Sequence, residues 1–145
     1  MQLPAGARLK FLTGLSRDEM IGLYQKAKVL VDSYITGCER EVFEAALFDV
    51  VPLVATHGNA RNPQDFPLPG SWRWPIFDYQ RLSQLVSAAL RDHAAAVADM
   101  APLRQFVTQM PAVFSEQVKR YFQVSWEMCE EDTENFHLTS HVFAG

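Results

Sequence analysis

The residues best suited to do chemistry lie between positions 36 and 44, just after a short apolar run at 29–31. Gly37 and Cys38 fall where a helix is expected to begin, and the free N–H groups of a helix N-terminus bind anions such as phosphate. Gly37 has no Cβ, so a diphosphate can approach the backbone there. Arg40 can add a two-pronged charged contact to the same phosphates. Gly37, Cys38 and Arg40 are therefore candidate phosphate ligands.

A helix cap is the alternative interpretation of the same residues. Thr36 and Glu39 have the T-x-x-E spacing of a capping box, in which both side chains bind backbone N–H groups of the first turn. Arg40 is then an ordinary solvent-exposed residue of that turn. Glu39 and Glu41 also place negative charge beside the proposed phosphate site. The residues alone leave both interpretations open.

The elements that must position these residues alternate between strand and helix. Ser16 and Glu19 form a second capping box, and apolar residues recur at helical spacing behind it. The short apolar runs are typical of strands buried on both faces. The expected elements are a strand at 9–13 ending at Gly14, a helix at 17–28, a strand at 29–31, a helix ending near Asp49 and a strand at 52–55. This order predicts an α/β fold with a Rossmann-like parallel sheet and right-handed crossovers.

The second half of the chain has a helical pattern instead. A polar loop with three prolines is expected at 57–70, and Trp72 and Trp74 after it either stack on a ligand or anchor the loop to the core. Three amphipathic helices follow: one behind Asp78, one from Leu103 that Pro111 ends, and one from Phe114 to Cys129. We expect a single domain over 1–145, with an α/β segment at 1–77, helices at 78–130 and a tail at 131–145.

Composition limits the classes of function. Of 145 residues, 48% are hydrophobic and 21% charged, enough for a packed core. The net charge of -4 argues against nucleic-acid binding, although a local basic cluster can still bind phosphate. Two distant cysteines, no signal peptide and no spanning apolar run predict a cytoplasmic chain. His137 and His141 have helical metal-ligand spacing but lack a third ligand, so we expect no metal and no cofactor.

Residues 12–56 resemble the middle of the C-terminal domain of retaining GT-B glycosyltransferases. In that family a glycine-ended strand precedes a helix of the form E-L-x-x-x-Y-x-x-A, and a buried strand, E-G-F-G-x-x-x-x-E-A and P-V-V-A follow. The matching segments here are Leu12-Thr13-Gly14, Glu19-Met20 with Leu23-Tyr24-Gln25-Lys26-Ala27, Gly37 with Glu44-Ala45-Ala46, and Pro52-Leu53-Val54-Ala55. The match covers about the first half of the chain.

The resemblance implies a function and a set of binding residues. Such a domain holds a nucleotide diphosphate sugar, and a separate N-terminal domain holds the acceptor. Glu44 would bind the ribose hydroxyls, Thr36 occupies the position of the family's first glutamate, and Gly14 lies at the turn after the first strand. Two strands that belong between 9–13 and 29–31 in the family's sheet are missing from this sequence. We therefore expect a fragment, a domain completed by another polypeptide, or a rearranged sheet, inactive alone in each case. The alternative is a non-catalytic interaction module that keeps the same fold.

Overall fold

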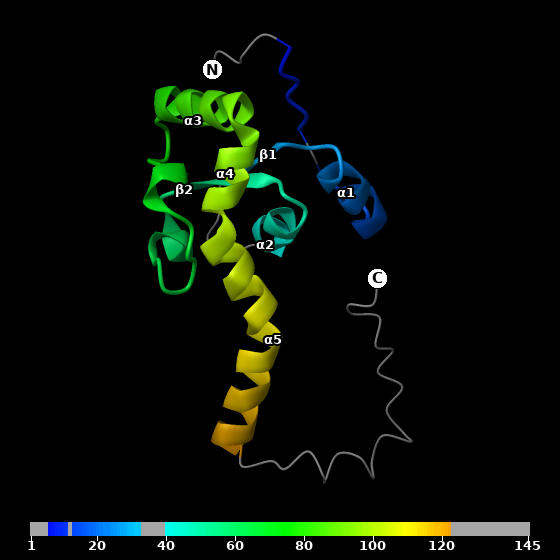
Figure 1. The fold of residues 1–145 in the computed structure, drawn as a ribbon, viewed down its shortest axis with the longest axis vertical. Coiled ribbons are helices and arrows are strands. Elements are labelled where there is room, and N and C mark those ends of the chain that lie inside the picture. The colour runs from blue at the N-terminus through cyan, green and yellow to red at the C-terminus, as the bar shows by residue number, and fades with distance from the viewer. Residues whose placement is uncertain (1–5, 12, 33–39, 123–145) are drawn as a thin grey trace. The chain divides into compact units, whose positions relative to one another are not determined.

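A computed structural model describes residues 6–11, 13–32 and 40–122 of the chain. It divides into two compact units, Met1–Thr108 and Gln109–Gly145. The first unit contains the sheet and the helices that pack on it, and every element of the candidate site belongs to it (Figure 1). The fold is mixed α/β, with a parallel sheet whose strand order is β1-β2-β3.

The three strands are β1 (Val29–Asp32), β2 (Val51–Ala55) and β3 (Arg73–Trp74). Leu30 of β1 lies opposite Pro52 of β2, and β2 pairs with β3 only through its last two residues. A proline in a central strand normally removes a ladder hydrogen bond. Here the N–H of Val51 donates to the C=O of Lys28, so alternation points the nitrogen of Pro52 away from β1. The Pro52 nitrogen faces the side of β2 on which β3 lies, but β3 pairs only with Val54 and Ala55. The missing N–H of Pro52 therefore removes no hydrogen bond between strands.

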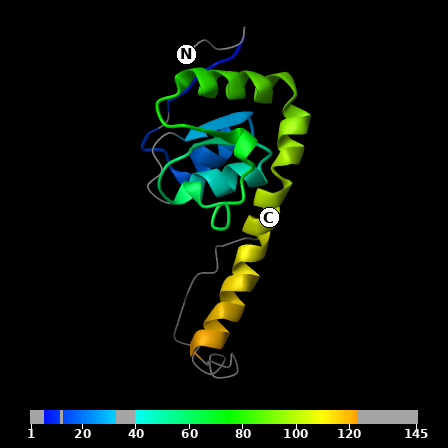
Figure 2. The ribbon, with the colours of Figure 1, turned by 90° about the vertical axis from the view of Figure 1, so that its left-hand side faces the viewer.

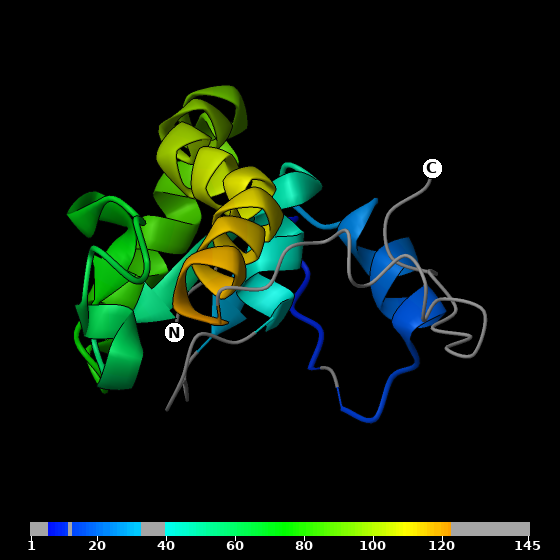
Figure 3. The same cartoon turned by 90° about the horizontal axis from the view of Figure 1, so that it is seen from below.

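Helices cover both faces of the sheet. Helix α2 (Arg40–Leu47) connects β1 to β2, and α3 (Tyr79–Arg91) follows β3. Figures 1 and 2 both place α3 on one side of the strands and α2 on the other. Helix α1 (Arg17–Tyr24) lies on the β1 side, and the segment 58–74 lies on the opposite side (Figures 1 and 3). The short helices η1 (Gly58–Arg61) and η2 (Gly70–Trp72) belong to that segment, and α4 (His93–Asp99) leads from α3 into α5 (Ala101–Phe122).

The core lies around β2 and the side of the sheet that carries β3. All five residues of β2 are buried, whereas all four residues of β1 are only partly buried. The buried apolar side chains that join β2 in the core come from α2, α3, α4, the first turn of α5 and the segment 58–74, and include Val42, Phe66, Trp74, Leu85 and Leu103. The region predicted as a polar loop thus contributes to the core. Trp72 donates its indole N–H to Asp99 at 2.9 Å, which fits the interpretation that the tryptophans anchor the loop.

The prediction of an N-terminal strand at 9–13 is wrong. The described residues of that segment form no strand, and Phe11 is 86% exposed. Alternating apolar and polar residues favour a strand only where a neighbouring strand satisfies the backbone, and β1 pairs with β2 alone among the described residues. The third strand is β3 instead. β1 was also expected to be buried on both faces, but its position at the edge leaves all four residues only partly buried.

Helix boundaries correct two further expectations. The Ser16–Glu19 capping box is present, but α1 ends at Tyr24 rather than near Lys28. Pro111, which was expected to end a helix, lies inside α5 instead. A proline removes one internal hydrogen bond, and the carbonyl left unpaired belongs to a turn whose neighbouring residues are exposed. Water can satisfy that carbonyl, so the helix continues as one element. The predicted helix from Phe114 extends to Cys129, and residues 123–129 lie outside the described part.

Candidate functional site

The candidate site is the edge of the sheet at which the strands end. In open parallel sheets, ligands bind beyond the carboxyl ends of the strands, where the following helices present free N–H groups. β1 ends at Asp32, and the chain re-enters a described helix at Arg40. β2 ends at Ala55 and is followed by Thr56 and His57. β3 leads to Asp78, which caps α3 by accepting the N–H of Arg81 at 2.8 Å. The exposed residues Thr56 and His57 follow the central strand at this edge.

Arg40 and Glu44 form an ion pair on the first two turns of α2. The Arg40 Nε donates to Glu44 Oε1 at 2.5 Å, and the two side chains are 65% and 25% exposed. This i, i+4 pairing joins two of the predicted ligand residues. An exposed pair of this kind adds only about 0.3–0.5 kcal/mol to stability. A ligand can therefore displace it at low cost, which leaves a cationic fork and a carboxylate side by side after β1.

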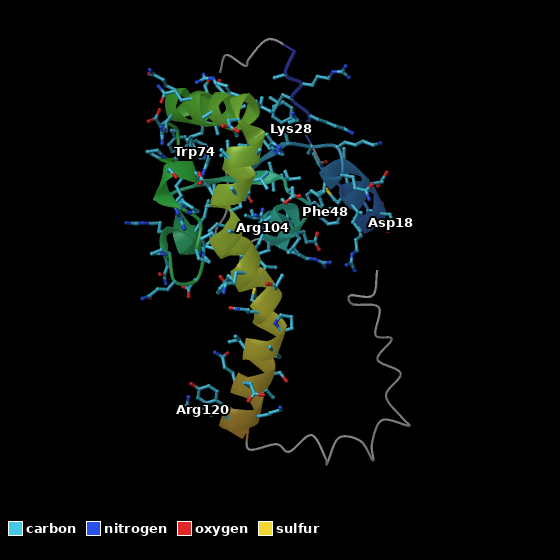
Figure 4. All side chains as sticks on the ribbon, viewed as in Figure 1. Asp18, Lys28, Phe48, Trp74, Arg104 and Arg120 are labelled. Atoms are coloured by element: carbon cyan, nitrogen blue, oxygen red, sulfur yellow. The ribbon has the colours of Figure 1, made fainter. Side chains whose placement is uncertain are left out.

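Tyr24 connects α1 to the same part of α2. Its side chain is buried, it stacks on Phe48 with ring centroids 5.6 Å apart, and its hydroxyl donates to the Glu41 C=O at 3.3 Å. Burial and the carboxylates of Glu44 and Glu41 raise the pKa of Tyr24 to about 12. The tyrosine is therefore neutral at physiological pH and acts as a hydrogen-bond donor. Phe48 is labelled in Figure 4 on the side of α2 that faces α1.

A broad groove of about 1980 Å³ opens along β1. Its walls are α1 and the segment 6–15 on one side and α3 on the other, with β1 as the floor. Gly14 lines this groove with a φ of +64°, a conformation that glycine adopts without strain. Lys28 and Trp74 also line it and are labelled in Figure 4. Glu41 and Asp32 extend the groove to the carboxyl end of β1.

The predicted site residues divide into three groups. Arg40 and Glu44 are brought together, but neither lines the groove that contains Gly14. Gly14 is thus placed with the β1 edge rather than with the ion pair. Thr36, Gly37 and Cys38, including the choice between a cap and a phosphate site, lie outside the described residues. So do His137 and His141.

Three aromatic residues lie near the end of β3, and of these only Trp74 was considered from the sequence as a possible ligand contact. The indole N–H of Trp74 is buried and has no hydrogen-bond partner among the described residues. Phe77 has a φ of +73° and is 68% exposed, and Tyr79 is 56% exposed. Strained backbone and exposed aromatic rings at a ligand edge are features that mark binding sites. The only signal in the sequence was the run of aromatic residues itself. No sequence pattern predicts the positive φ of Phe77.

No group of three or more His, Cys, Asp or Glu side chains in the described ranges is arranged to hold a metal ion. Among the same residues, no helix combines the length and the apolar character needed to cross a membrane. In comparisons with known proteins, no family model, no curated protein and no solved structure matches this chain.

Proposed function

We propose that this chain is a nucleotide-diphosphate-sugar-binding domain of the GT-B glycosyltransferase type. The observation that carries the proposal is the Arg40–Glu44 pair on the first two turns of α2, after the carboxyl end of β1. Arg40 would bind the diphosphate, and Glu44 would accept hydrogen bonds from the ribose hydroxyls. Gly37 and Cys38 would offer backbone N–H groups to the same phosphates, and Thr36 would cap α2 or contact the sugar. No metal or cofactor takes part in this binding.

The sheet supports the same proposal at a coarser level. Its strands are parallel, and helices follow at the edge where nucleotides bind in open α/β sheets. Sugar transfer also requires hydrogen-bond donors fixed around the leaving diphosphate and a bound acceptor substrate. We infer that a separate domain or partner chain supplies both. The domain therefore binds the donor sugar but is inactive alone.

Calorimetric titration with UDP-, GDP- and ADP-glucose tests the proposal. Binding of one of them with a millimolar or lower Kd is expected, and Glu44→Ala should weaken it by at least about tenfold, since a hydrogen bond to a charged group contributes about 1.5–3 kcal/mol. Arg40→Ala should weaken it to a similar extent. The matched control is the ion pair of Glu116 and Lys119, also exposed and on a helix, whose alanine variants should leave the Kd unchanged. Absence of binding to all three nucleotides would contradict the proposal.

A non-catalytic interaction module is the second candidate, and the exposed face of α5 favours it. Met110, Val113, Phe114 and Tyr121 recur at helical spacing, and each is between 41% and 77% exposed. A large apolar stripe of this kind is typical of a surface that binds another helix. Sedimentation equilibrium would detect self-association, which Phe114→Glu should abolish and Glu116→Gln should not.

A further inference from the structure

The groove along β1 has a polar backbone floor that the sheet leaves open. β1 pairs with β2 on one side and with no other strand among the described residues. The Lys28 C=O accepts the N–H of Val51, so by alternation Leu30 and Asp32 also face β2. The peptide groups of Val29 and Val31 therefore point toward the groove. A row of unpaired N–H and C=O groups is a template for another strand.

The side walls of the groove are apolar. Leu82, Val86 and Leu90 of α3 lie on one side, and Met20 and Leu23 of α1 lie on the other. Alternating side chains of an added strand would point to these two walls in turn, because successive residues of a strand face opposite sides. The groove therefore matches an extended segment that is apolar on both faces. A globular ligand or a flat ring would leave the backbone floor unpaired.

The rim of the groove is basic, although the whole chain is acidic. Its lining has two acidic residues, Asp32 and Glu41, against a larger number of cations. The cations are Arg8, Lys10, Lys26, Lys28 and Arg91. None of them forms a salt bridge within the part of the chain that the structure describes. Five positive charges against two, in a chain of net charge -4, mark this groove for an acidic partner.

We propose that the open edge of β1 binds an extended polypeptide segment with an apolar centre and acidic flanks, which adds to the sheet as a fourth strand. The backbone of Val29 and Val31 forms the ladder, the walls from α1 and α3 hold the apolar side chains, and the lysines and arginines of the rim bind the acidic flanks. Strand addition of this kind takes its affinity from main-chain hydrogen bonds and its specificity from the side-chain pockets. The inference does not depend on nucleotide binding, because Arg40 and Glu44 do not line the groove.

The probe is a fluorescent peptide of alternating valine and leucine, apolar on both faces, with two glutamates at each end, titrated against the full chain by fluorescence anisotropy. Saturable binding is expected. The same peptide with its amides N-methylated cannot form a ladder and should not bind. Lys26→Glu with Lys28→Glu should weaken binding by about tenfold, since both side chains are exposed on the rim. The matched control is Lys119→Glu with Arg120→Glu, an equal change of charge outside the groove, which should leave the affinity unchanged.

Val31→Pro tests the ladder from the side of the protein. It removes an N–H that faces the groove and leaves the bonds to β2 in place, and prolines are accepted on edge strands in this orientation. The variant should fold and lose peptide binding by at least about tenfold. If the variant does not fold, the comparison of the N-methylated and unmethylated peptides tests the ladder without it. Equal binding of the methylated and unmethylated peptides, or no effect of the rim reversal, would overturn the proposal.

Two other occupants are outcomes of the same experiments. If the full chain fails to bind the peptide but a variant lacking residues 1–13 binds it, the edge belongs to the chain's own N-terminal segment. If the chain dimerises and Val31→Pro abolishes the dimer, the edge belongs to a second copy. Either result would overturn the assignment to a separate acidic segment.

Discussion

β1 and β2 are neighbouring strands of similar composition, yet their surroundings differ completely. β2 is buried at every position, between α2 on one face and α3 on the other, with a strand on each side. β1 carries the sequence VLVD, is partly buried at every position and, within residues 6–11, 13–32 and 40–122, has a neighbouring strand on one side only. The difference comes from position in the sheet rather than from hydrophobicity. β2 therefore supplies stability. The carboxyl end of β1 leads to the proposed nucleotide site, and the open edge of β1 forms the proposed peptide groove.

The largest expected effect is the unequal cost of truncating the two strands. Leu53→Ala in β2 should lower the free energy of unfolding by about 2–5 kcal/mol, because Leu53 is fully buried. Leu30→Ala in β1 should cost clearly less, since the half-buried side chain leaves a smaller cavity. Urea denaturation of both variants measures the difference. Equal losses of unfolding free energy would show that the two strands contribute equally to stability.

Trp72→Phe should make β2 resemble an edge strand. The substitution removes the hydrogen bond from the indole to Asp99, which holds the residues before β3 against α4. A hydrogen bond to a charged acceptor contributes about 1.5–3 kcal/mol. We expect a loss of that order, together with faster hydrogen exchange at Val54 and Trp74. Exchange that stays as slow as in the unsubstituted chain would show that β3 does not depend on this contact.

Ser16→Ala should weaken α1, the helix beside the open strand. The Ser16 side chain accepts the N–H of Glu19, and the Glu19 carboxylate accepts from Ser16, which lowers the pKa of Glu19. Loss of such a cap costs about 1 kcal/mol. Hydrogen exchange should accelerate in residues 17–24 and remain unchanged in 51–55. Acceleration in both segments would instead make α1 part of the main cooperative unit.

The last expected effect is confined to alkaline pH and concerns Tyr24, which packs beside Leu30 of β1. Burial and nearby carboxylates raise the pKa of Tyr24 to about 12, so the folded chain favours the neutral phenol. This contribution to stability is complete below the ordinary tyrosine pKa near 10 and is lost as the pH rises toward 12. The Tm should therefore fall over that range, and Tyr24→Phe should reduce the fall. An ultraviolet titration in which every tyrosine ionises near pH 10 would contradict the raised pKa of Tyr24.

The sequence predicted the parts of the fold that depend on local chemistry. The capping box of α1, the apolar face of α2 and the runs that form β1 and β2 all have short-range patterns. The strand expected at 9–13 failed because alternation says nothing about whether a neighbouring strand exists. β3 was missed because two residues between a 3-10 helix and a turn have no period to detect.

The candidate site was likewise predictable only where its residues are close in the sequence. Arg40 and Glu44 were predicted as ligands, and their i, i+4 spacing on one helix brings them into contact. The basic rim of the groove was not predicted, because its cations come from three separate segments of the chain. Arg8 and Arg91 meet at one surface only after folding. Composition could indicate no more than an acidic chain in which a local basic cluster was possible.

The most direct test of nucleotide binding beside β1 is an amide chemical-shift titration with the nucleotide sugar that binds best. We predict the largest shifts in the first two turns of α2, from Arg40 to Glu44, and at Asp32, with little change in α5. Glu44→Ala should remove these shifts while the rest of the spectrum is retained. Shifts confined to α5, or no shifts with any of the UDP, GDP and ADP sugars, would contradict it.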